Sequence, residues 1–452
     1  MVQKNEIVEL SIHSISNDGN GVGLYDGLAV FVPYTVVGDR LLVKIVKLKK
    51  SYAFGIIDKI LEPAPERDEP QCPAYRRCGG CSFRHMSYRA ELDAKREIVC
   101  AALTRLGGLD IEIRETVPSP CQTEYRNKVQ FPVSMHGGNL CVGLYAKRTH
   151  DVVDASECNL QPKLLNDIAA YACRILDSQQ VCAYNEISHV GLLRHIFLRI
   201  SGKTGNVMLC VVLNGLRLPK EDVFVEKITR EFNAISSIIV NVNKTRGNVI
   251  LGETCRTIFG DDFLFDEMCG IPVRLSPLSF FQINTKAAEQ LYGLIALLAD
   301  LKENETLLDL YCGTGTIGLS MAKAKHFRHL IGVEVIPSAI ADATENAKAL
   351  GFDNCTFIAD DASGAAVRLA KSNVSIDVAV VDPPRRGCDE ECLGALISMS
   401  PDRIVMVSCN PATLARDLKY LCAHGYIAKT AIPVDLFPRT QHVECVVLMS
   451  RK

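Results

Sequence analysis

The chain has 452 residues, of which 48% are hydrophobic and 23% charged, and its formal net charge is −2. This length favours two to four domains. Because the net charge is close to zero, binding to nucleic acid would have to come from local basic patches. No apolar run reaches the roughly 20 residues that a membrane-spanning helix needs, and the N-terminus has no apolar signal core. We therefore expect a cytoplasmic protein with no membrane contact, and no feature of the sequence indicates an obligate protein partner.

Cysteine is the unusual component of the composition. The chain contains 19 cysteines, an odd number, and they are spread over its whole length. Without an export signal the thiols are expected to be reduced, so that a cluster of them indicates metal binding or catalysis and not a disulfide framework. Isolated cysteines are more often small buried hydrophobic residues.

Residues 1–60 alternate short apolar stretches with turn signals, which predicts a small β-barrel of the oligonucleotide-binding kind. Cations beside aromatic rings suit phosphate contacts and base stacking, although lysines also guard exposed edge strands. The segment concerned contains Arg40, Lys44, Lys47, Lys49 and Lys50, followed by Tyr52 and Phe54. The proline-rich and charged stretch 62–70 predicts a linker.

The region 61–275 opens with three cysteines, Cys72, Cys78 and Cys81, within ten residues. A complete ligand set needs a fourth thiol, for which Cys158 is a candidate. Four thiolates suit either tetrahedral zinc or an iron–sulfur cluster, and the spacing alone does not separate the two. The rest of this region mixes helical and strand patterns, which predicts an α+β domain, and it contains no recognisable catalytic motif.

From residue 276 to residue 452 strands alternate with helices, which predicts a parallel sheet. The predicted strands are 307–311, 330–334, 356–358, 376–381, 403–407, 428–433 and 443–449. Seven strands in this order are typical of the α/β, Rossmann-like domain of class I methyltransferases that use S-adenosylmethionine. This region is therefore the expected catalytic domain.

The loop after the first of these strands contains Gly313, Gly315 and Gly318, and Glu334 follows at the end of the second strand. This spacing also fits dinucleotide binding, so a dinucleotide-dependent oxidoreductase with an iron–sulfur cluster is a competing interpretation. Asp309 lies in the strand just before the glycines. An acid there suits a cationic sulfonium and its amino group, whereas an anionic pyrophosphate would gain nothing from it.

Two further acidic positions favour S-adenosylmethionine. Asp360 and Asp361 follow the third strand, where a carboxylate can accept a hydrogen bond from the adenine amine. Asp382 begins an Asp-Pro-Pro loop at the end of the fourth strand, as in methyltransferases that modify bases. Arg385 follows the two prolines in place of the aromatic residue of enzymes that methylate exocyclic amines, which favours methylation of carbon.

Methylation of a pyrimidine at C5 needs a nucleophile and a base, because C5 is itself a poor nucleophile. A thiolate that adds to C6 makes C5 reactive toward the methyl donor, and a base must then remove the C5 proton. Cys409 follows the fifth strand, and Glu444 lies at the start of the last strand. Both are expected at the sheet edge where α/β proteins bind their ligands.

Together these motifs resemble the RNA uracil-5-methyltransferase family, which makes 5-methyluridine in ribosomal and transfer RNA. The resemblance covers nearly the whole chain. It rests on the N-terminal barrel, which resembles a TRAM domain, on the cysteine set, and on residues 279–284, 309–315, 382–385, 408–411 and 437–444. It implies that Cys409 is the nucleophile and Glu444 the base, and that the four thiols hold a [4Fe–4S] cluster. The implied cofactor and base pocket is lined by Gln282, Tyr311, Gly313, Gly315, Thr316, Glu334, Asp360, Asp361 and Asp382.

Within the family, transfer-RNA enzymes look shorter and lack the barrel and the cysteine cluster. Their presence here favours ribosomal RNA as the partner, most simply the 23S molecule. A target base in folded RNA must be flipped out of its stack to reach Cys409. The alternatives are methylation of uracil in transfer RNA, and a non-catalytic RNA-binding or ribosome-assembly protein on a methyltransferase fold.

Overall fold

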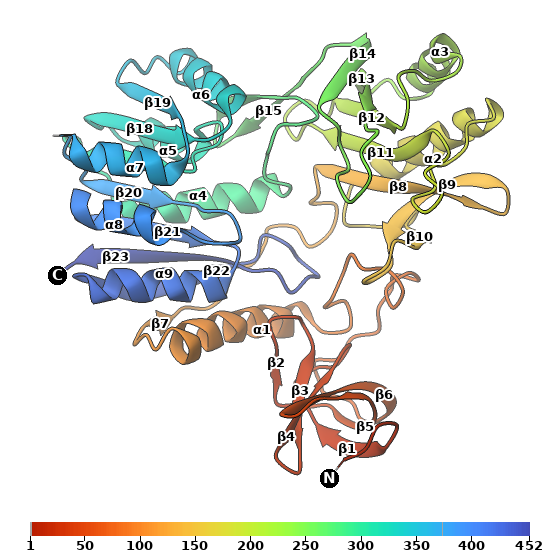
Figure 1. The fold of residues 1–452 in the computed structure, drawn as a ribbon, viewed down its shortest axis with the longest axis horizontal. Coiled ribbons are helices and arrows are strands. Elements are labelled where there is room, and N and C mark those ends of the chain that lie inside the picture. The colour runs from red at the N-terminus through yellow and green to blue at the C-terminus, as the bar shows by residue number, and fades with distance from the viewer. Residues whose placement is uncertain (1, 373) are drawn as a thin grey trace.

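The computed structural model describes residues 2–372 and 374–452, which form a barrel, a central α+β region and a C-terminal α/β region (Figure 1). The barrel strands are β1 (Ile7–Ser11), β2 (Ser14–Ile15), β3 (Gly21–Tyr25), β4 (Leu28–Val32), β5 (Arg40–Leu48) and β6 (Tyr52–Glu62). They hydrogen-bond in the order β1-β5-β6-β4-β3-β2. Alternate residues of β5 are buried, because one face of the curled sheet surrounds an apolar core. The predicted barrel is confirmed.

The central region is built on a second sheet, whose order is β10-β9-β8-β11-β12-β13-β14. Its elements are β8 (Lys128–His136), β9 (Asn139–Tyr145), β10 (Val152–Asp154), α2 (Lys163–Ser178), β11 (Leu193–Ile200), β12 (Val207–Leu213), α3 (Glu221–Glu231), β13 (Ile235–Val242) and β14 (Thr254–Gly260). Apolar residues of α2 and α3 cover one face of this sheet. The other face shares a core with the C-terminal region through the hairpin of β15 (Leu264–Met268) and β16 (Ile271–Leu275).

The C-terminal sheet has the strand order β19-β18-β17-β20-β21-β23-β22-β7, in which β7 (Glu112–Ile113) comes from an earlier part of the chain. Its strands are β17 (Thr306–Leu310), β18 (His329–Glu334), β19 (Cys355–Ala359), β20 (Val378–Val381), β21 (Arg403–Ser408), β22 (Tyr426–Val434) and β23 (Glu444–Arg451). Neighbouring strands from β19 to β21 pair in parallel, whereas β23 is antiparallel to both β21 and β22. Every residue of β17 and β20 is buried, as expected for parallel strands covered on both faces. The predicted methyltransferase-type sheet is confirmed.

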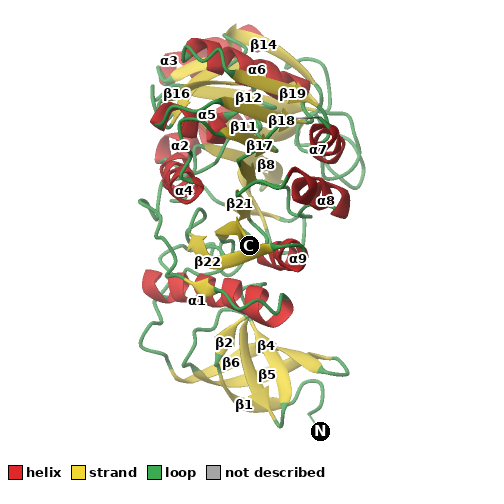
Figure 2. Ribbon diagram, turned by 90° about the vertical axis from the view of Figure 1, so that its left-hand side faces the viewer, coloured by secondary structure: helices red, strands yellow, loops and turns green. Residues whose placement is uncertain are grey.

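Helices cover both faces of this sheet. On one face lie α4 (Thr285–Ala299), α5 (Thr316–Ala324) and α6 (Pro337–Ala349). On the other lie α7 (Ala362–Lys371), α8 (Glu390–Met399) and α9 (Pro411–Ala423), which line up along one side in Figure 2. In sheets of this kind ligands bind at the carboxyl edge of the parallel strands.

A segment from early in the chain also packs on the C-terminal sheet. Helix α1 (Tyr88–Cys100), the π-helical turn η1 (Ala101–Leu106) and the short strand β7 (Glu112–Ile113) belong to it. β7 adds to the sheet edge in parallel with β22, and apolar residues of α1 and η1 join the core beneath α9. The sequence pattern placed this segment within the central region, but its packing partners lie near the C-terminus.

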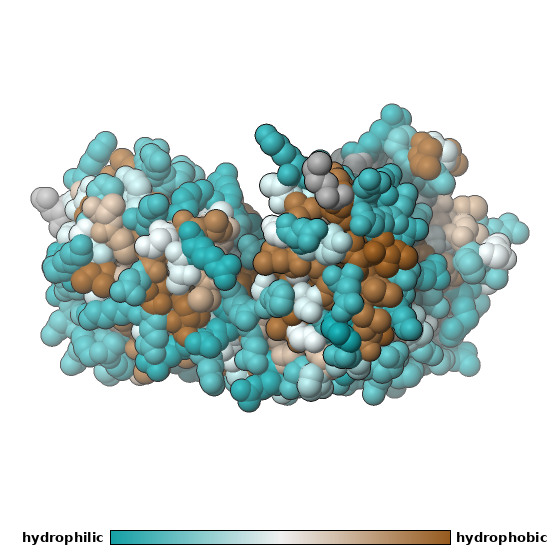
Figure 3. Space-filling model, turned by 90° about the horizontal axis from the view of Figure 1, so that it is seen from below, coloured by the Kyte–Doolittle hydropathy of each residue, from teal (hydrophilic) through white to brown (hydrophobic). Residues whose placement is uncertain are grey.

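The surface seen from the side of the barrel carries hydrophobic residues in separate patches among hydrophilic ones (Figure 3). Of the helices in the described ranges, none combines the length and the apolar character that crossing a membrane requires.

Candidate active site

Cys409 lies directly after strand β21, in a turn that hydrogen bonds fix. Asn410 caps helix α9 by accepting a hydrogen bond from the backbone N–H of Ala412 at 3.2 Å. The Asn410 side chain also donates to the carbonyl of Arg385 at 2.9 Å, and the Thr413 hydroxyl donates to the same oxygen at 3.3 Å. The cysteine turn and the Asp-Pro-Pro-Arg loop are thereby held against one another.

Glu444 lies beside Cys409 on the neighbouring strand. β21 and β23 pair antiparallel with Ser408 opposite Cys445, so that one step further along the two strands Cys409 faces Glu444. Only 7% of Glu444 is exposed. Burial and, to a smaller extent, the charge of Asp382 raise the pKa of Glu444 to about 8, although Arg385 opposes the shift. A buried carboxyl with a pKa close to neutral is suited to accept and release a proton.

The thiol of Cys409 shares these neighbours. Burial raises the pKa of Cys409, Glu444 and Asp382 add to the shift, and Arg385 lowers it. Burial also raises the pKa of Asp382 to about 6. The structure therefore brings the predicted nucleophile, the predicted base and the predicted Asp-Pro-Pro loop close enough for their charges to shift one another's pKa values.

The glycine loop forms the N-terminal approach to α5. Gly313 and Gly315 have positive φ angles of 56° and 76°, which glycine adopts without a steric penalty, and Gly315 caps α5. Gly318 leaves no room for a side chain, because an added Cβ would lie 2.8 Å from a methyl carbon of Leu330 and 2.9 Å from the Asp309 carboxylate. The loop thus closes tightly over the end of β17.

Asp309 carries an oxygen with no partner at this point. Its Oδ2 accepts a hydrogen bond from the Gly318 backbone N–H at 2.9 Å, whereas its Oδ1 is buried without a hydrogen bond. Burial raises the pKa of Asp309 to about 7. A buried acceptor without a donor is costly, and a ligand ammonium group would satisfy it. This arrangement fits S-adenosylmethionine.

Glu334 is the last residue of β18 and hydrogen-bonds to the glycine loop. Its carboxylate accepts hydrogen bonds from the backbone N–H of Gly313 at 3.3 Å and from that of Ile336 at 3.1 Å. Both interactions leave lone pairs on the carboxylate, which can accept further hydrogen bonds. The predicted position of Glu334 beside the loop is therefore observed.

The two acids after β19 have different local partners. Asp361 caps α7 by accepting from the backbone N–H of Gly364 at 2.9 Å. Asp360 forms an ion pair with Arg368. Asp361 thus has a structural task of its own, and both side chains lie at the edge that holds the glycine loop.

Three further predicted residues, Thr316, Gln282 and Tyr311, have different local partners. Thr316 begins α5, and its hydroxyl lies 3.4 Å from the hydroxyl of Tyr292. The backbone carbonyl of Gln282 accepts a hydrogen bond from the Asn127 side chain at 2.8 Å. Tyr311 has a left-handed φ angle of 66°, and its ring packs against the apolar core on the α8 side of the sheet. The Tyr311 backbone leads directly into the glycine loop.

The four predicted metal ligands, Cys72, Cys78, Cys81 and Cys158, line a single cavity of about 280 Å³, which we call the thiol cavity. Within the described ranges no three or more His, Cys, Asp or Glu side chains are placed in metal-binding geometry. The structure therefore gathers the thiols around one space but does not itself show a metal site.

Cationic groups surround the thiol cavity. The Arg84 Nε donates a hydrogen bond to the Cys81 sulfur at 3.2 Å, and the Gly80 backbone N–H donates to the Cys78 sulfur at 3.3 Å. Burial raises the pKa of Cys81, and the charges of Arg84 and Arg126 oppose this shift. Donors aimed at sulfur stabilise thiolates, the form that binds metals. The donor set thus fits a thiolate-bound group.

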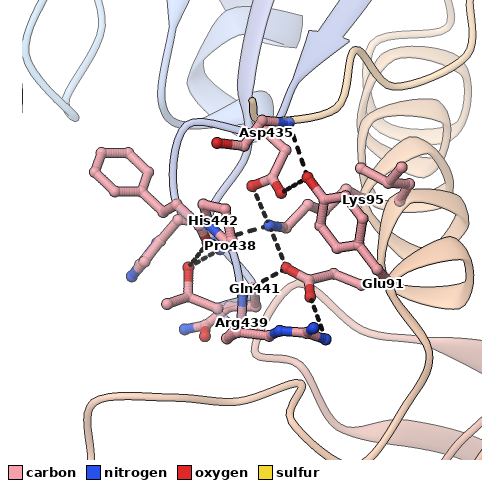
Figure 4. Close-up of polar contacts among 12 residues, drawn as sticks. Glu91, Lys95, Asp435, Pro438, Arg439, Gln441 and His442 are labelled. Carbon is pink, nitrogen blue, oxygen red and sulfur yellow. Dashed lines mark hydrogen bonds and ion pairs between the residues drawn. The ribbon is translucent and has the colours of Figure 1, made fainter. Parts of the chain in front are cut away.

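Three buried charged side chains near the active site gave no signal in the sequence. Lys95 of α1 donates hydrogen bonds to Glu91, one turn earlier, and to Asp435, just after β22 (Figure 4). An acid and a lysine four residues apart on a helix are typical of a solvated surface pair. Here all three side chains are fully buried, because a distant loop covers them.

The strand order and the glycine loop with its buried acid define a class I methyltransferase. Two family models match: the TRAM domain over residues 2–57 and the tRNA (uracil-5-)-methyltransferase family over residues 270–452. An uncharacterized RNA methyltransferase of Halalkalibacterium halodurans is 39% identical over the whole chain and 98% of the relative. One of Listeria innocua is 39% identical over the whole chain and 99% of the relative. The chain belongs to the RNA uracil-5-methyltransferase family.

A solved structure is also similar over its whole length. It is the Pyrococcus abyssi tRNA (uracil-54, C5)-methyltransferase in complex with S-adenosyl-L-homocysteine. It is 26% identical, the match covers 98% of this chain and 100% of that one, and the TM-score is 0.77. The protein is thus an RNA methyltransferase that uses S-adenosylmethionine and carries a TRAM domain, and the dinucleotide-dependent interpretation is set aside.

Proposed function

We propose that this protein methylates C5 of a uracil in RNA by covalent catalysis, with Cys409 as the nucleophile and Glu444 as the base. The observation that carries the proposal is the pairing of β21 with β23, which sets the thiol opposite a buried carboxylate at the sheet edge that holds the glycine loop. A scaffold protein would have no use for a base facing a thiol.

The reaction begins when the Cys409 thiolate adds to C6 of the flipped base and the electron pair of the C5–C6 double bond moves toward the O4 oxygen. C5 then attacks the methyl group of S-adenosylmethionine, and S-adenosylhomocysteine leaves. The Glu444 carboxylate takes the proton from C5, the double bond re-forms, and the thiolate is expelled. Because the pKa of Glu444 is raised to about 8, the carboxylate form that accepts the proton predominates only above about pH 8.

Two RNA classes are candidates for the substrate. We favour ribosomal RNA, most simply 23S, because the resemblance associates the cysteine cluster with enzymes that modify ribosomal RNA. Transfer RNA is the second candidate, since the Pyrococcus abyssi relative is a transfer-RNA enzyme and matches 98% of this chain. The expectation that transfer-RNA enzymes are shorter and lack the barrel is wrong for this relative, so neither chain length nor the barrel discriminates between the two substrates.

For the thiol cavity we propose a [4Fe–4S] cluster held by Cys72, Cys78, Cys81 and Cys158, with zinc as the alternative. A group bound by four thiolates would tie the segment 72–81 to the turn at Cys158. Its place outside the set of Cys409, Glu444 and Asp382 gives it no part in methyl transfer.

Mapping of 5-methyluridine in ribosomal and transfer RNA from cells with and without this gene tests the proposed function. We expect one or two uracils to lose the methyl group when the gene is absent, and a plasmid copy to restore it. Identical maps from both strains would contradict the proposal. The RNA class in which the difference appears decides between the two substrates.

A further inference from the structure

The ammonium group of Lys95 is completely buried, and all three of its N–H donors have hydrogen-bond acceptors. It donates to Glu91 Oε1 at 2.8 Å, to Asp435 Oδ1 at 2.5 Å and to the backbone carbonyl of Phe437 at 3.2 Å (Figure 4). An ammonium group has three N–H donors, and each one here has a defined acceptor. The side chains of Lys95, Glu91 and Asp435 are each 0% exposed. Lys95 therefore fixes the place of Asp435 and Phe437 relative to α1.

Stability alone is a weak reason for such a network. Taking three charges out of water is costly, and apolar side chains of similar size often fill the same space at no loss. A buried charged network is better explained when the geometry that it imposes is needed. The geometry that Lys95 imposes is that of the loop between β22 and β23.

This loop leads directly to the proposed base. In the pairing of β22 with β23, Val434 is the partner of Glu444, and Asp435 is the next residue after Val434. Lys95 thus binds Asp435, which is one residue away from Val434, the strand partner of Glu444. Glu444 is the first residue of β23, so the course of this loop sets where its carboxylate lies.

The middle of the loop is held by the same helix. Arg439 has a left-handed φ angle of 70°, which is unfavourable for a residue with a side chain. Its backbone N–H donates to Glu91 Oε1 at 2.7 Å, and its guanidinium lies 3.7 Å from Glu91 Oε2. The contacts with Glu91 therefore stabilise the left-handed conformation of Arg439.

A tyrosine of α1 binds the second carboxylate oxygen of Asp435. The hydroxyl of Tyr88 donates to Asp435 Oδ2 at 2.7 Å and accepts a hydrogen bond from the Ser119 backbone N–H at 2.8 Å. Both oxygens of Asp435 thus have donors on α1. The carboxylate has a single available orientation.

We propose that Lys95 is a positioning residue for Glu444, which acts by clamping Asp435 and Phe437 so that the carboxylate faces C5 of the base bound to Cys409. This inference rests on the proposed function. It assigns to α1 a part in proton removal, and none in the attack by Cys409 or in the transfer of the methyl group.

The test uses the double variant Lys95→Met with Asp435→Asn, which removes one positive and one negative charge and leaves the Glu91–Arg439 contact in place. The matched control is Arg89→Met with Asp93→Asn, an exposed pair on the same helix. The full-length proteins receive S-adenosylmethionine and total RNA from cells that lack this gene. A second RNA sample comes from such cells grown with 5-fluorouracil, whose C5 fluorine cannot leave as a proton, so that its adduct forms without any base.

With the fluorinated RNA we expect the double variant to form its denaturant-stable adduct within twofold of the wild-type rate. With ordinary RNA we expect adduct to accumulate and product release to slow by roughly ten- to a hundredfold, because a small displacement of a catalytic group has effects of this size. The control pair should match the wild type. The variant Tyr88→Phe, which removes only one hydroxyl, should show the same defect in smaller degree.

Equal release rates for wild type and both variants would overturn the role of Lys95, and so would an equal slowing of trapping and release. If the double variant does not fold, Tyr88→Phe decides alone. If wild-type protein traps no fluorinated RNA, it is the proposed function that fails, and the two failures are thereby distinguished.

Discussion

Cys409 and the cysteines of the thiol cavity differ in the charged groups beside them. The charged neighbours of Cys409 are the carboxyl groups of Glu444 and Asp382, which raise the pKa of its thiol beyond the effect of burial, and the guanidinium of Arg385, which opposes them. The near neighbour of Cys81 is the guanidinium of Arg84, which donates a hydrogen bond to the sulfur and lowers its pKa against the effect of burial.

The difference separates two uses of one chemical group. A carboxylate can take a proton and return it, so a thiol beside it can take part in a cycle of attack, proton removal and release. A guanidinium keeps its proton at any ordinary pH and can only stabilise an anion. The sheet edge that carries Cys409, Glu444 and Asp382, which we call the proposed catalytic edge, is thus suited to proton transfer. The thiol cavity is suited to holding thiolates. Each of the following predictions tests one side of this contrast.

The largest effect is expected from Cys409→Ala. Without the nucleophile C5 is not activated, and turnover should fall by more than about a thousandfold. Cys422→Ala, a half-buried cysteine of α9, is the matched control and should retain activity. Methyl transfer to RNA is measured with labelled S-adenosylmethionine. Activity of Cys409→Ala within tenfold of the wild type would contradict the role of Cys409 as the nucleophile.

Glu444→Gln should have the next largest effect, because it removes the base and leaves the nucleophile. We expect turnover to fall by about a hundredfold to ten-thousandfold and a denaturant-stable protein–RNA adduct to accumulate. In the wild type the rate of adduct release should rise with pH and level off above the pKa of Glu444, about 8. The same rise in Glu444→Gln would show that another group is the base.

Asp309→Asn tests the cofactor side of the proposed catalytic edge. Asparagine still offers an acceptor to the Gly318 N–H but no charge to the ligand ammonium group. Hydrogen bonds to charged groups contribute about 1.5–3 kcal/mol, so the affinity for S-adenosylhomocysteine should fall by roughly ten- to a hundredfold. Calorimetric titration measures this affinity. Unchanged binding would mean that the free oxygen of Asp309 faces no part of the cofactor.

The raised pKa of Glu444 also predicts how stability varies with pH. Between the ordinary pKa of about 4.5 and the folded-state value of about 8, the folded protein binds more protons than the unfolded protein. The contribution of Glu444 to the free energy of unfolding therefore falls as pH rises through this window, by at most about 1.4 kcal/mol per pH unit. Glu444→Gln should lack this slope. Parallel stability profiles of the two proteins, measured by urea unfolding, would contradict the assignment.

The smallest effect on turnover is expected from Cys72→Ser combined with Cys158→Ser. Protein purified without oxygen should lose iron and sulfide, while methyl transfer at saturating RNA falls far less than in Cys409→Ala. Cys182→Ser, an exposed cysteine elsewhere, should keep its metal content. Zinc without iron in the wild-type protein would favour the alternative ligand of the thiol cavity.

The proposed catalytic edge could be predicted from the sequence, because its residues sit at the ends of strands. Asp309, Asp382 and Cys409 each lie in or after an apolar run, and parallel strands bring their carboxyl ends to the same edge. The antiparallel last strand places its first residue, Glu444, at that edge as well. Local pattern and one rule of topology were therefore sufficient.

Other features depended on contacts between distant segments and could not be predicted. Lys95 meets Asp435 across 340 residues, and its spacing from Glu91 is that of an exposed helical pair. The ring of Tyr311 packs against the core on the α8 side of the sheet, a contact that no motif shows. The two-residue strand β7 was too short to give a pattern.

The most direct test of the central claim is to find the residue that carries the RNA. Wild-type protein is incubated with S-adenosylmethionine and fluorinated RNA from cells that lack this gene, then digested, and the cross-linked peptide is sequenced by mass spectrometry. The covalent mechanism predicts a single adduct on the Cys409 sulfur. An adduct on another cysteine, or methylation of ordinary RNA with no adduct on Cys409, would contradict it.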